Sequence, residues 1–286
     1  MTSQGHIRGR RVVLIRRVVA ALTAALLVAG GLAGCSIWVH IPRTIPPGGT
    51  SAPVGDVPAI ATFDPAFIVS DAQFFDESAL TQREVQRFLL RAGCQATSSA
   101  PCLWEYRTTT PDRAADAYCD EYVGEADEPA ASIIVRVARA CGVSPKVLLV
   151  LLQKEQSLLT RPTERGYRSA TGYNCPDTAD CDARFYGFFN QVYSAARQFQ
   201  AYRQGTKWRY RVGEVAVKFN PDPSCGQAVV NIQNQATAGL YNYTPYQPTA
   251  EAIANPDDSG PCRTFGNLNF WRLWSKWFGN PHSVGQ

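Results

Sequence analysis

The chain has 286 residues, of which 45% are hydrophobic and 18% are charged. This composition is typical of a globular protein and excludes a disordered one, and the length allows one large domain or two small ones. The net charge of +4 comes from the N-terminus, because residues 1–34 carry five arginines and no acid. The remaining 23 basic and 24 acidic residues nearly cancel, so the sequence predicts no nucleic-acid partner.

The N-terminus has the pattern of an export signal. Arginines lead into VVAALTAALLVAGGLAGC, whose last four residues, Leu32 to Cys35, resemble a bacterial lipobox. This predicts a signal peptide over residues 1–34 and lipidation of Cys35. The alternative is an uncleaved signal-anchor helix, because the sequence stays apolar through Ile41. Both interpretations predict an extracytoplasmic protein attached to the outer face of the cytoplasmic membrane of a Gram-positive-type bacterium.

A membrane spacer and one mainly helical domain are expected after the signal. Residues 35–64 are rich in proline and glycine and predict an extended spacer, followed by a folded domain over residues 65–280 and a tail over 281–286. Apolar residues at helical spacing, together with capping residues, predict the helices. Alternation of apolar and polar residues predicts a short β-hairpin. The expected helices are 81–93 (capped by Ser78 or Thr81), 128–142, the segment after Ser144-Pro145, 190–205, 228–246 and 267–279, with the hairpin at 207–219.

Trp271, Trp274 and Trp277 recur at helical spacing near the end of the chain. This spacing indicates a helix that packs on the core more than it indicates a sugar-binding surface.

The cysteines indicate a disulfide framework. Eight follow Cys35, and an even set in an exported chain predicts four disulfides. Short loops favour Cys94–Cys102 and Cys175–Cys181, after which Cys119–Cys141 and Cys225–Cys262 follow as neighbours, although the sequence leaves other connectivities open. The chain has no CxxC pair, so we expect no zinc site.

The histidines exclude several kinds of catalysis. His6 lies in the signal, His40 in the spacer and His282 in the tail, so none lies within the expected domain. This argues against serine and cysteine nucleophiles that need a histidine and against histidine-ligated zinc. No glycine-rich phosphate loop is present. An enzyme here would work with carboxylates and without a cofactor or metal, which points to the cleavage of glycosidic bonds.

Glu155 is the acidic residue best placed for such chemistry. On a helical wheel, five leucines lie within about 60° of it (Leu148, Leu151, Leu152, Leu158 and Leu159). Apolar surroundings and the negative end of the helix dipole would both favour a protonated carboxyl, which protonation of a glycosidic oxygen requires. The structural alternative is a solvent-exposed last turn or an ion pair with Arg161, Arg165, Arg168, Arg184 or Arg197.

Three segments carry a resemblance to a known family. LLVLLQKEQSLL around Glu155 resembles the helix that bears the catalytic glutamate in lytic transglycosylases and goose-type lysozymes. YGFFNQVYSAARQF (186–199) is similar to that family's GLMQ segment and following helix, and ATAGLYNYTPY (236–246) is similar to its ALAAYNAGP. The sequence departs from the family at Gln156, where serine is usual, at Asn190, where glutamine is usual, and in the missing glycine after YNA.

The resemblance implies a mainly α, lysozyme-like domain with a catalytic core at about residues 130–250. It implies that Glu155 is the general acid and that the substrate-binding residues are Tyr186, Asn190, Gln191, Tyr241 and Asn242. The whole module also resembles an uncharacterised domain of exported actinobacterial cell-surface proteins, which implies no activity.

The family's substrate is the peptidoglycan glycan strand, in which the glutamate protonates the oxygen between N-acetylmuramic acid and N-acetylglucosamine. The resemblance therefore implies a lytic transglycosylase, or a hydrolase that positions water, often with an aspartate. Asp177, Asp180 and Asp182 are available, although a solvated, disulfide-bounded turn is the expected role of their loop. The alternative function is a non-catalytic glycan-binding or adhesion lipoprotein of the same fold.

Overall fold

The structure is a computed structural model that describes residues 63–175, 181–257 and 259–283. The chain divides into Met1–Gly49 and Thr50–Gln286, and all the described residues belong to the second unit. The expected signal peptide, the lipidation site Cys35 and the spacer through residue 62 lie outside the described residues. Within the described part, no helix is long and apolar enough to span a bilayer.

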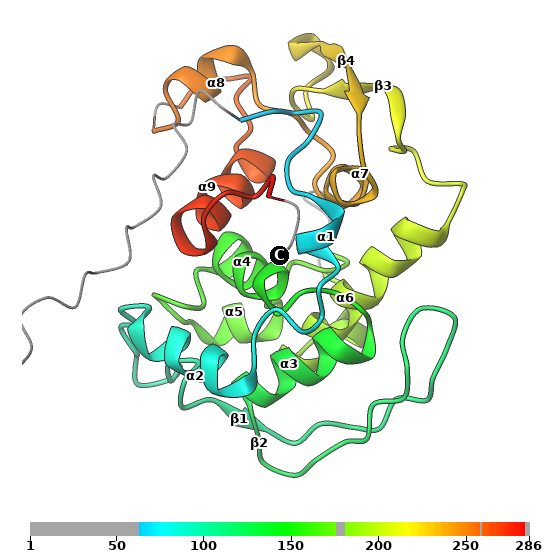
Figure 1. Cartoon of the computed structure of the whole chain (residues 1–286). Coiled ribbons are helices and arrows are strands. Elements are labelled where there is room, and N and C mark those ends of the chain that lie inside the picture. Colours follow the sequence, from blue (N-terminus) through cyan, green and yellow to red (C-terminus); the bar gives the residue numbers. More distant parts are fainter. Residues whose placement is uncertain (1–62, 176–180, 258, 284–286) are drawn as a thin grey trace, which may run out of the picture. The chain divides into compact units, whose positions relative to one another are not determined.

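The described part is mainly helical, which confirms that part of the predicted fold class (Figure 1). Two antiparallel two-stranded sheets accompany the helices, with Arg107 opposite Pro129 in one and Gly213 opposite Ile232 in the other. The helices are α1 (Asp71–Phe74), α2 (Gln82–Arg91), α3 (Ala130–Ala140), α4 (Pro145–Gln156), α5 (Glu164–Arg168), α6 (Phe188–Gln204), α7 (Gln235–Tyr243), α8 (Ala250–Ala254) and α9 (Gly266–Phe278), and the strands are β1 (Arg107–Thr108), β2 (Glu128–Pro129), β3 (Gly213–Lys218) and β4 (Gln227–Ile232).

Local capping explains where two of the predicted helices begin. At α2, the Thr81 hydroxyl accepts from the Glu84 amide while the Glu84 carboxylate accepts from the Thr81 amide, which forms a complete capping box. At α4, the Ser144 hydroxyl accepts from the Lys146 amide, and Pro145 fills the first helical position. Both helix starts were expected from the sequence. Of the two candidate caps for α2, Ser78 and Thr81, the structure shows Thr81.

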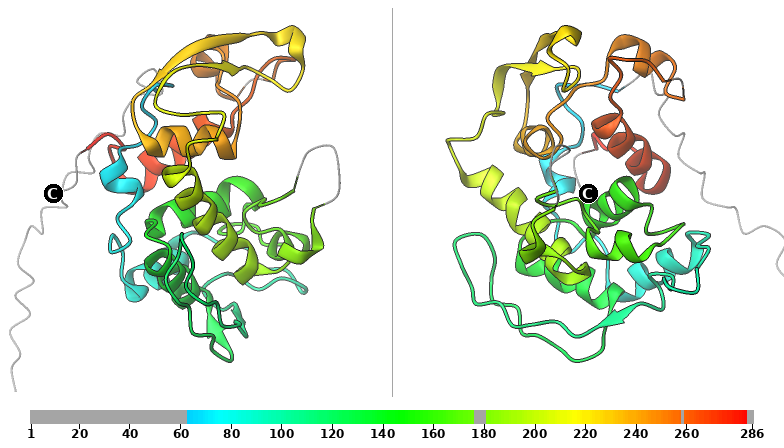
Figure 2. Two further views of the ribbon diagram at one scale, coloured as in Figure 1. Left: turned by 90° about the vertical axis from the view of Figure 1, so that its right-hand side faces the viewer. Right: turned by 180° about the vertical axis from the view of Figure 1, so that it is seen from behind.

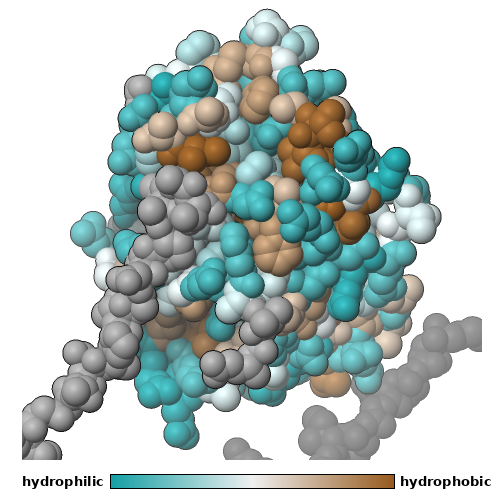
Figure 3. All heavy atoms as spheres, turned by 45° about the horizontal axis from the view of Figure 1, so that its top comes forward, coloured by the Kyte–Doolittle hydropathy of each residue, from teal (hydrophilic) through white to brown (hydrophobic). Residues whose placement is uncertain are grey.

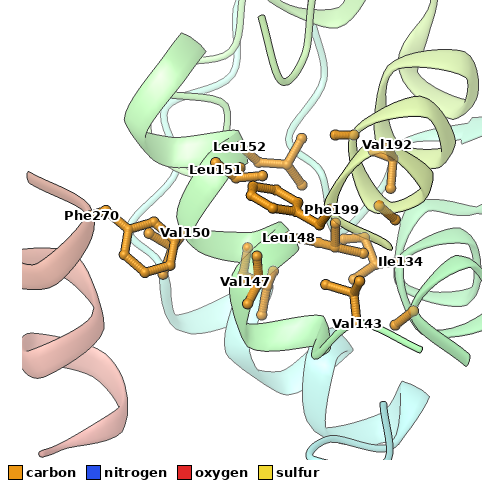
Figure 4. Close-up of a cluster of buried hydrophobic side chains, with 14 of the residues drawn as sticks. Ile134, Val143, Val147, Leu148, Val150, Leu151, Leu152, Val192, Phe199 and Phe270 are labelled. Carbon is orange, nitrogen blue, oxygen red and sulfur yellow. The ribbon is translucent and has the colours of Figure 1, made fainter. Parts of the chain in front are cut away.

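Helix α4 lies in the centre of the core. Every residue from Val147 to Leu152 is buried, because α4 contacts α3 on one side and α9 on another (Figure 4). Figure 4 shows Phe270 of α9 beside Val150, and Phe199 of α6 beside Leu148 and Leu152. A helix enclosed in this way needs apolar side chains all round, which explains the unbroken run VLLVLL.

The structure contains the four predicted disulfides: Cys94–Cys102, Cys119–Cys141, Cys175–Cys181 and Cys225–Cys262. Disulfides form and persist in oxidising compartments, so this framework indicates an extracytoplasmic protein.

One predicted element is wrong in part. Residues 228–246 were expected to form one helix, but Ala228–Ile232 belongs to β4, which pairs with β3, and α7 begins only at Gln235. The hairpin expected within 207–219 therefore has its second strand farther along the chain. The β-branched residues of β4 alternate in burial, with Val230 and Ile232 buried and Val229 exposed. Asn234 then caps α7 by accepting from the Thr237 amide.

The hairpin β3–β4 and the pair β1–β2 lie at opposite ends of the described unit in all three ribbon views (Figure 2). The face in Figure 3 is largely hydrophilic, with separate apolar patches. Trp271 and Trp274 are buried in the core, and Trp277 is partly buried against it, which confirms the predicted packing role of all three. The beginning of the expected tail packs on α1, because Pro281 accepts from the Ser70 amide.

Candidate active site

Glu155 lies in the last turn of α4, which ends at Gln156 and is followed by Ser157 in the left-handed conformation. The leucines of α4 on its side of the wheel (Leu148, Leu151 and Leu152) are buried, as expected, whereas the buried Leu158 and Leu159 lie beyond the end of the helix. The Glu155 side chain itself is 24% exposed. The carboxyl group is therefore packed against the core but open to solvent on one side.

The partner of Glu155 is the neighbouring Lys154, which no pattern in the sequence indicated. The Lys154 ammonium forms a salt bridge with Glu155 Oε1, and its side chain is only 6% exposed. It also donates a hydrogen bond to the Thr244 hydroxyl over 3.2 Å, which ties the end of α4 to the residue after α7. Within the described part of the chain, none of the five arginines offered as the structural alternative forms a salt bridge with Glu155.

A backbone loop approaches the other carboxylate oxygen. A Cβ placed on Gly172 would lie 3.4 Å from Glu155 Oε2, and Gly172 has a φ of +69°, which favours glycine. The 171–173 loop therefore lies beside the glutamate, at a distance where an added methyl group would make ordinary van der Waals contact with it. Sequence reasoning missed Gly172, because a single glycine in an irregular segment gives no sign of what it faces.

Gln191 holds the 171–173 loop in place. Its side chain is buried, with Oε1 accepting from the Tyr173 amide at 3.0 Å and from the Thr171 amide at 3.2 Å. Its Nε2 donates to the carbonyls of Tyr173 and Phe185. Both amide hydrogens are thus used within the protein. The structure places this predicted substrate-binding residue behind the loop that faces Glu155.

Tyr243 is the tyrosine of α7 that belongs to the Glu155 region. Its hydroxyl donates to the Thr171 carbonyl at 2.7 Å, and its ring stacks on Phe199 of α6. Burial raises the pKa of the Tyr243 phenol well above its usual value, and the negative charge of Glu155 adds to this. Tyr243 is therefore a neutral hydrogen-bond donor that holds the same loop as Gln191.

The predicted pair Tyr241 and Asn242 contacts other parts of the chain. The buried Tyr241 donates to the Pro65 carbonyl at 2.9 Å, while Asn242 donates to the Tyr210 carbonyl at 2.7 Å and accepts from its amide. Consecutive residues on a helix point about 100° apart, so Tyr241, Asn242 and Tyr243 cannot all face one site. Within α7, Tyr243 and not the predicted pair Tyr241 and Asn242 is the residue that bonds to the loop beside Glu155.

Tyr186 and Asn190 bond to each other and to residues other than Glu155. Asn190 Nδ2 donates to the Tyr186 carbonyl, while its Oδ1 accepts from Arg113 at 2.7 Å. Tyr186 donates to the Cys181 carbonyl at 3.1 Å. Asp182 pairs with Arg184, which lowers the pKa of that carboxyl, whereas Asp177 and Asp180 lie outside the described residues.

Asn190 lines a hollow of about 430 Å³. Three arginines and three aromatic residues form much of its wall: Arg113, Arg184, Arg197, Tyr173, Phe185 and Tyr193. Tyr173 directly follows Gly172, so the loop that contacts Glu155 also lines this hollow. Among the described residues, no group of three His, Cys, Asp or Glu side chains could hold a metal ion.

Comparison with protein-family models, with curated proteins and with solved structures finds no match to this chain.

Proposed function

We propose that this protein cleaves peptidoglycan glycan strands outside the cytoplasmic membrane, as a lytic transglycosylase or a muramidase- or glucosaminidase-like hydrolase, with Glu155 as the general acid. The observation that carries the proposal is spatial. Three segments chosen for their resemblance to lysozyme-like enzymes meet at one place: α4 carries Glu155, and the loop against its carboxylate is held by Gln191 of α6 and Tyr243 of α7.

The chemistry requires a carboxyl group that reaches solvent from a rigid support. Glu155 meets this requirement, because its helix is fixed in the core while its side chain is 24% exposed. A protonated Glu155 would donate to the leaving glycosidic oxygen, and the cation-like sugar centre would be captured by water or by the sugar's own hydroxyl. Lys154 has the Thr244 hydroxyl as a second acceptor when Glu155 takes up a proton.

A second candidate function is a non-catalytic glycan-binding or adhesion lipoprotein. The salt bridge from Lys154 favours it, because a salt bridge is an interaction of the ionised carboxylate, whereas a general acid begins its work protonated. In both candidates the expected lipidation of Cys35, or the alternative signal-anchor helix, attaches the protein to the membrane.

Digestion of purified sacculi separates the two functions. We expect the wild-type protein to release soluble fragments, and mass spectrometry then distinguishes anhydro-muropeptides, made by a transglycosylase, from reducing ends, made by a hydrolase. Glu155→Gln should lower the rate at least about a hundredfold. Glu164→Gln is the matched control, since Glu164 is an exposed acid of α5, and it should leave the rate unchanged.

The proposal fails if the wild type releases nothing, or if Glu155→Gln releases fragments at the wild-type rate. If the wild type sediments with sacculi but releases no fragments, the protein has the second function, non-catalytic glycan binding.

A further inference from the structure

The hollow lined by Asn190 contains three arginines that have no part in the proposed cleavage chemistry. Two of its arginines have carboxylate partners: Arg184 pairs with Asp182, and Arg197 pairs with Asp116 at 2.6 Å. Arg113 has none among the described residues. Its polar side-chain partner is the neutral Asn190, over 2.7 Å. Of the three arginines that line the hollow, Arg113 is therefore the one that forms no salt bridge with a carboxylate of the described residues.

The position of the Arg113 guanidinium is fixed by its neighbours. Its carbon lies 5.6 Å from the ring centre of Phe189 and 5.7 Å from that of Tyr193. The Arg113 backbone also pairs with Tyr122 through two hydrogen bonds of 2.8 Å. A guanidinium has five N–H donors, and the bond to Asn190 uses one of them. Arg113 also lines the hollow, where the remaining donors of a guanidinium suit a planar anion.

The rest of the wall suits a sugar ring. Tyr173, Phe185 and Tyr193 supply aromatic surface, with Tyr173 and Phe185 in edge-to-face contact at 4.9 Å. A volume of about 430 Å³ lies within the range of small-molecule binding sites. Because Gly172 and Tyr173 are adjacent, a ligand in the hollow lies across one loop from Glu155.

We propose that this hollow is a binding site for a carboxylate carried by the glycan strand, with Arg113 as the residue that recognises it. The identity of the glycan rests on the function proposed above, whereas the anion site rests on Arg113 and its surroundings. In peptidoglycan the carboxylate can come from the lactyl ether of muramic acid or from the peptide attached to it. Arg113 would select strands that bear this charge over neutral chitin-like strands.

The test measures the affinity of three disaccharides by calorimetry, using the full chain with Glu155→Gln so that nothing is cleaved. The probes are N-acetylglucosaminyl-N-acetylmuramic acid, its neutral methyl ester, and the same disaccharide with a dipeptide on the lactyl group. We expect the free acid or the dipeptide compound to bind roughly tenfold more tightly than the ester. Which of the two does so identifies the source of the carboxylate.

The preference for the acid should disappear in Arg113→Gln and remain in Arg91→Gln, which removes the same charge from an exposed arginine at the end of α2. Arg113→Lys keeps the charge but not the forked donors, so it should keep part of the preference. Circular dichroism of each variant checks that it is folded.

Equal affinity for the acids and the ester, a preference that survives Arg113→Gln, or no binding of any probe would overturn the inference. A sacculus digestion that fails while the preference persists would reject the enzymatic function and leave the carboxylate site in place.

Discussion

Gly172 shows how a single residue can couple backbone conformation to the candidate site. Its φ of +69° disfavours any side chain, and an added Cβ would touch the carboxylate of Glu155 at 3.4 Å. The contact matters because the 171–173 loop also bonds to Gln191 and Tyr243. A change at Gly172 should therefore affect both the stability of the protein and the position of the loop beside Glu155.

We predict that Gly172→Ala lowers the free energy of unfolding by about 1 kcal/mol and also reduces sacculus cleavage. Gly93→Ala is the matched control, because Gly93 has a similar φ of +72° but an added Cβ would meet nothing within 4 Å. The control should lose similar stability in urea unfolding and keep its cleavage rate. Equal cleavage by both variants would contradict the role given to the loop.

At the scale of elements, Glu128 connects β2, α3 and the 107–125 region. The carboxylate is fully buried and accepts from Thr110 at 2.6 Å, Tyr122 at 2.7 Å and Ser132 at 2.8 Å, and it forms a salt bridge with Arg136. Burial by itself would raise the pKa of Glu128, but these hydrogen bonds outweigh it and hold the pKa below its usual value.

The lowered pKa of Glu128 predicts a loss of stability in acid. Its contribution is present above the pKa of an unfolded glutamate, roughly 4.3, and is lost as the pH falls through the lower folded value. We predict that Glu128→Gln reduces the free energy of unfolding at pH 7 by about 3 kcal/mol and flattens its decline below pH 4 or so.

Glu125→Gln is the control for Glu128→Gln, because Glu125 pairs with the same Arg136 but is 58% exposed. It should change the free energy of unfolding by less than about 1 kcal/mol. Urea unfolding at several pH values measures both variants, and equal losses would contradict the role of the buried network.

Sequence patterns predicted the long elements better than the short ones. The capping box at Thr81 and the Ser144-Pro145 start are local signals that act within one turn of helix, and both were confirmed. Residues 228–232 were assigned to a helix, because a short apolar run does not show whether a β-strand partner exists. That partner, β3, is supplied by a different part of the chain.

At the scale of the whole molecule, the disulfides differ in how much of the chain they close. Cys225–Cys262 spans 37 residues, whereas Cys175–Cys181 spans 6. A longer closed loop removes more entropy from the unfolded chain. We predict that replacing both cysteines by serine costs about 1.5 kcal/mol more for Cys225–Cys262 than for Cys175–Cys181, as measured by guanidinium unfolding. Equal losses would show that native packing outweighs loop entropy.

The sequence by itself predicted the main helices, favoured the disulfide pairing that the structure contains and indicated Glu155 as the candidate acid, since periodicity, cysteine spacing and an apolar stripe are all visible along the chain. Only the tertiary structure decided what surrounds that glutamate. Lys154 is held against it by Thr244 from beyond α7, and the loop at Gly172 is fixed by Gln191 and Tyr243. These contacts join segments far apart in the sequence, and their geometry depends on how the helices pack around α4, which no local pattern records.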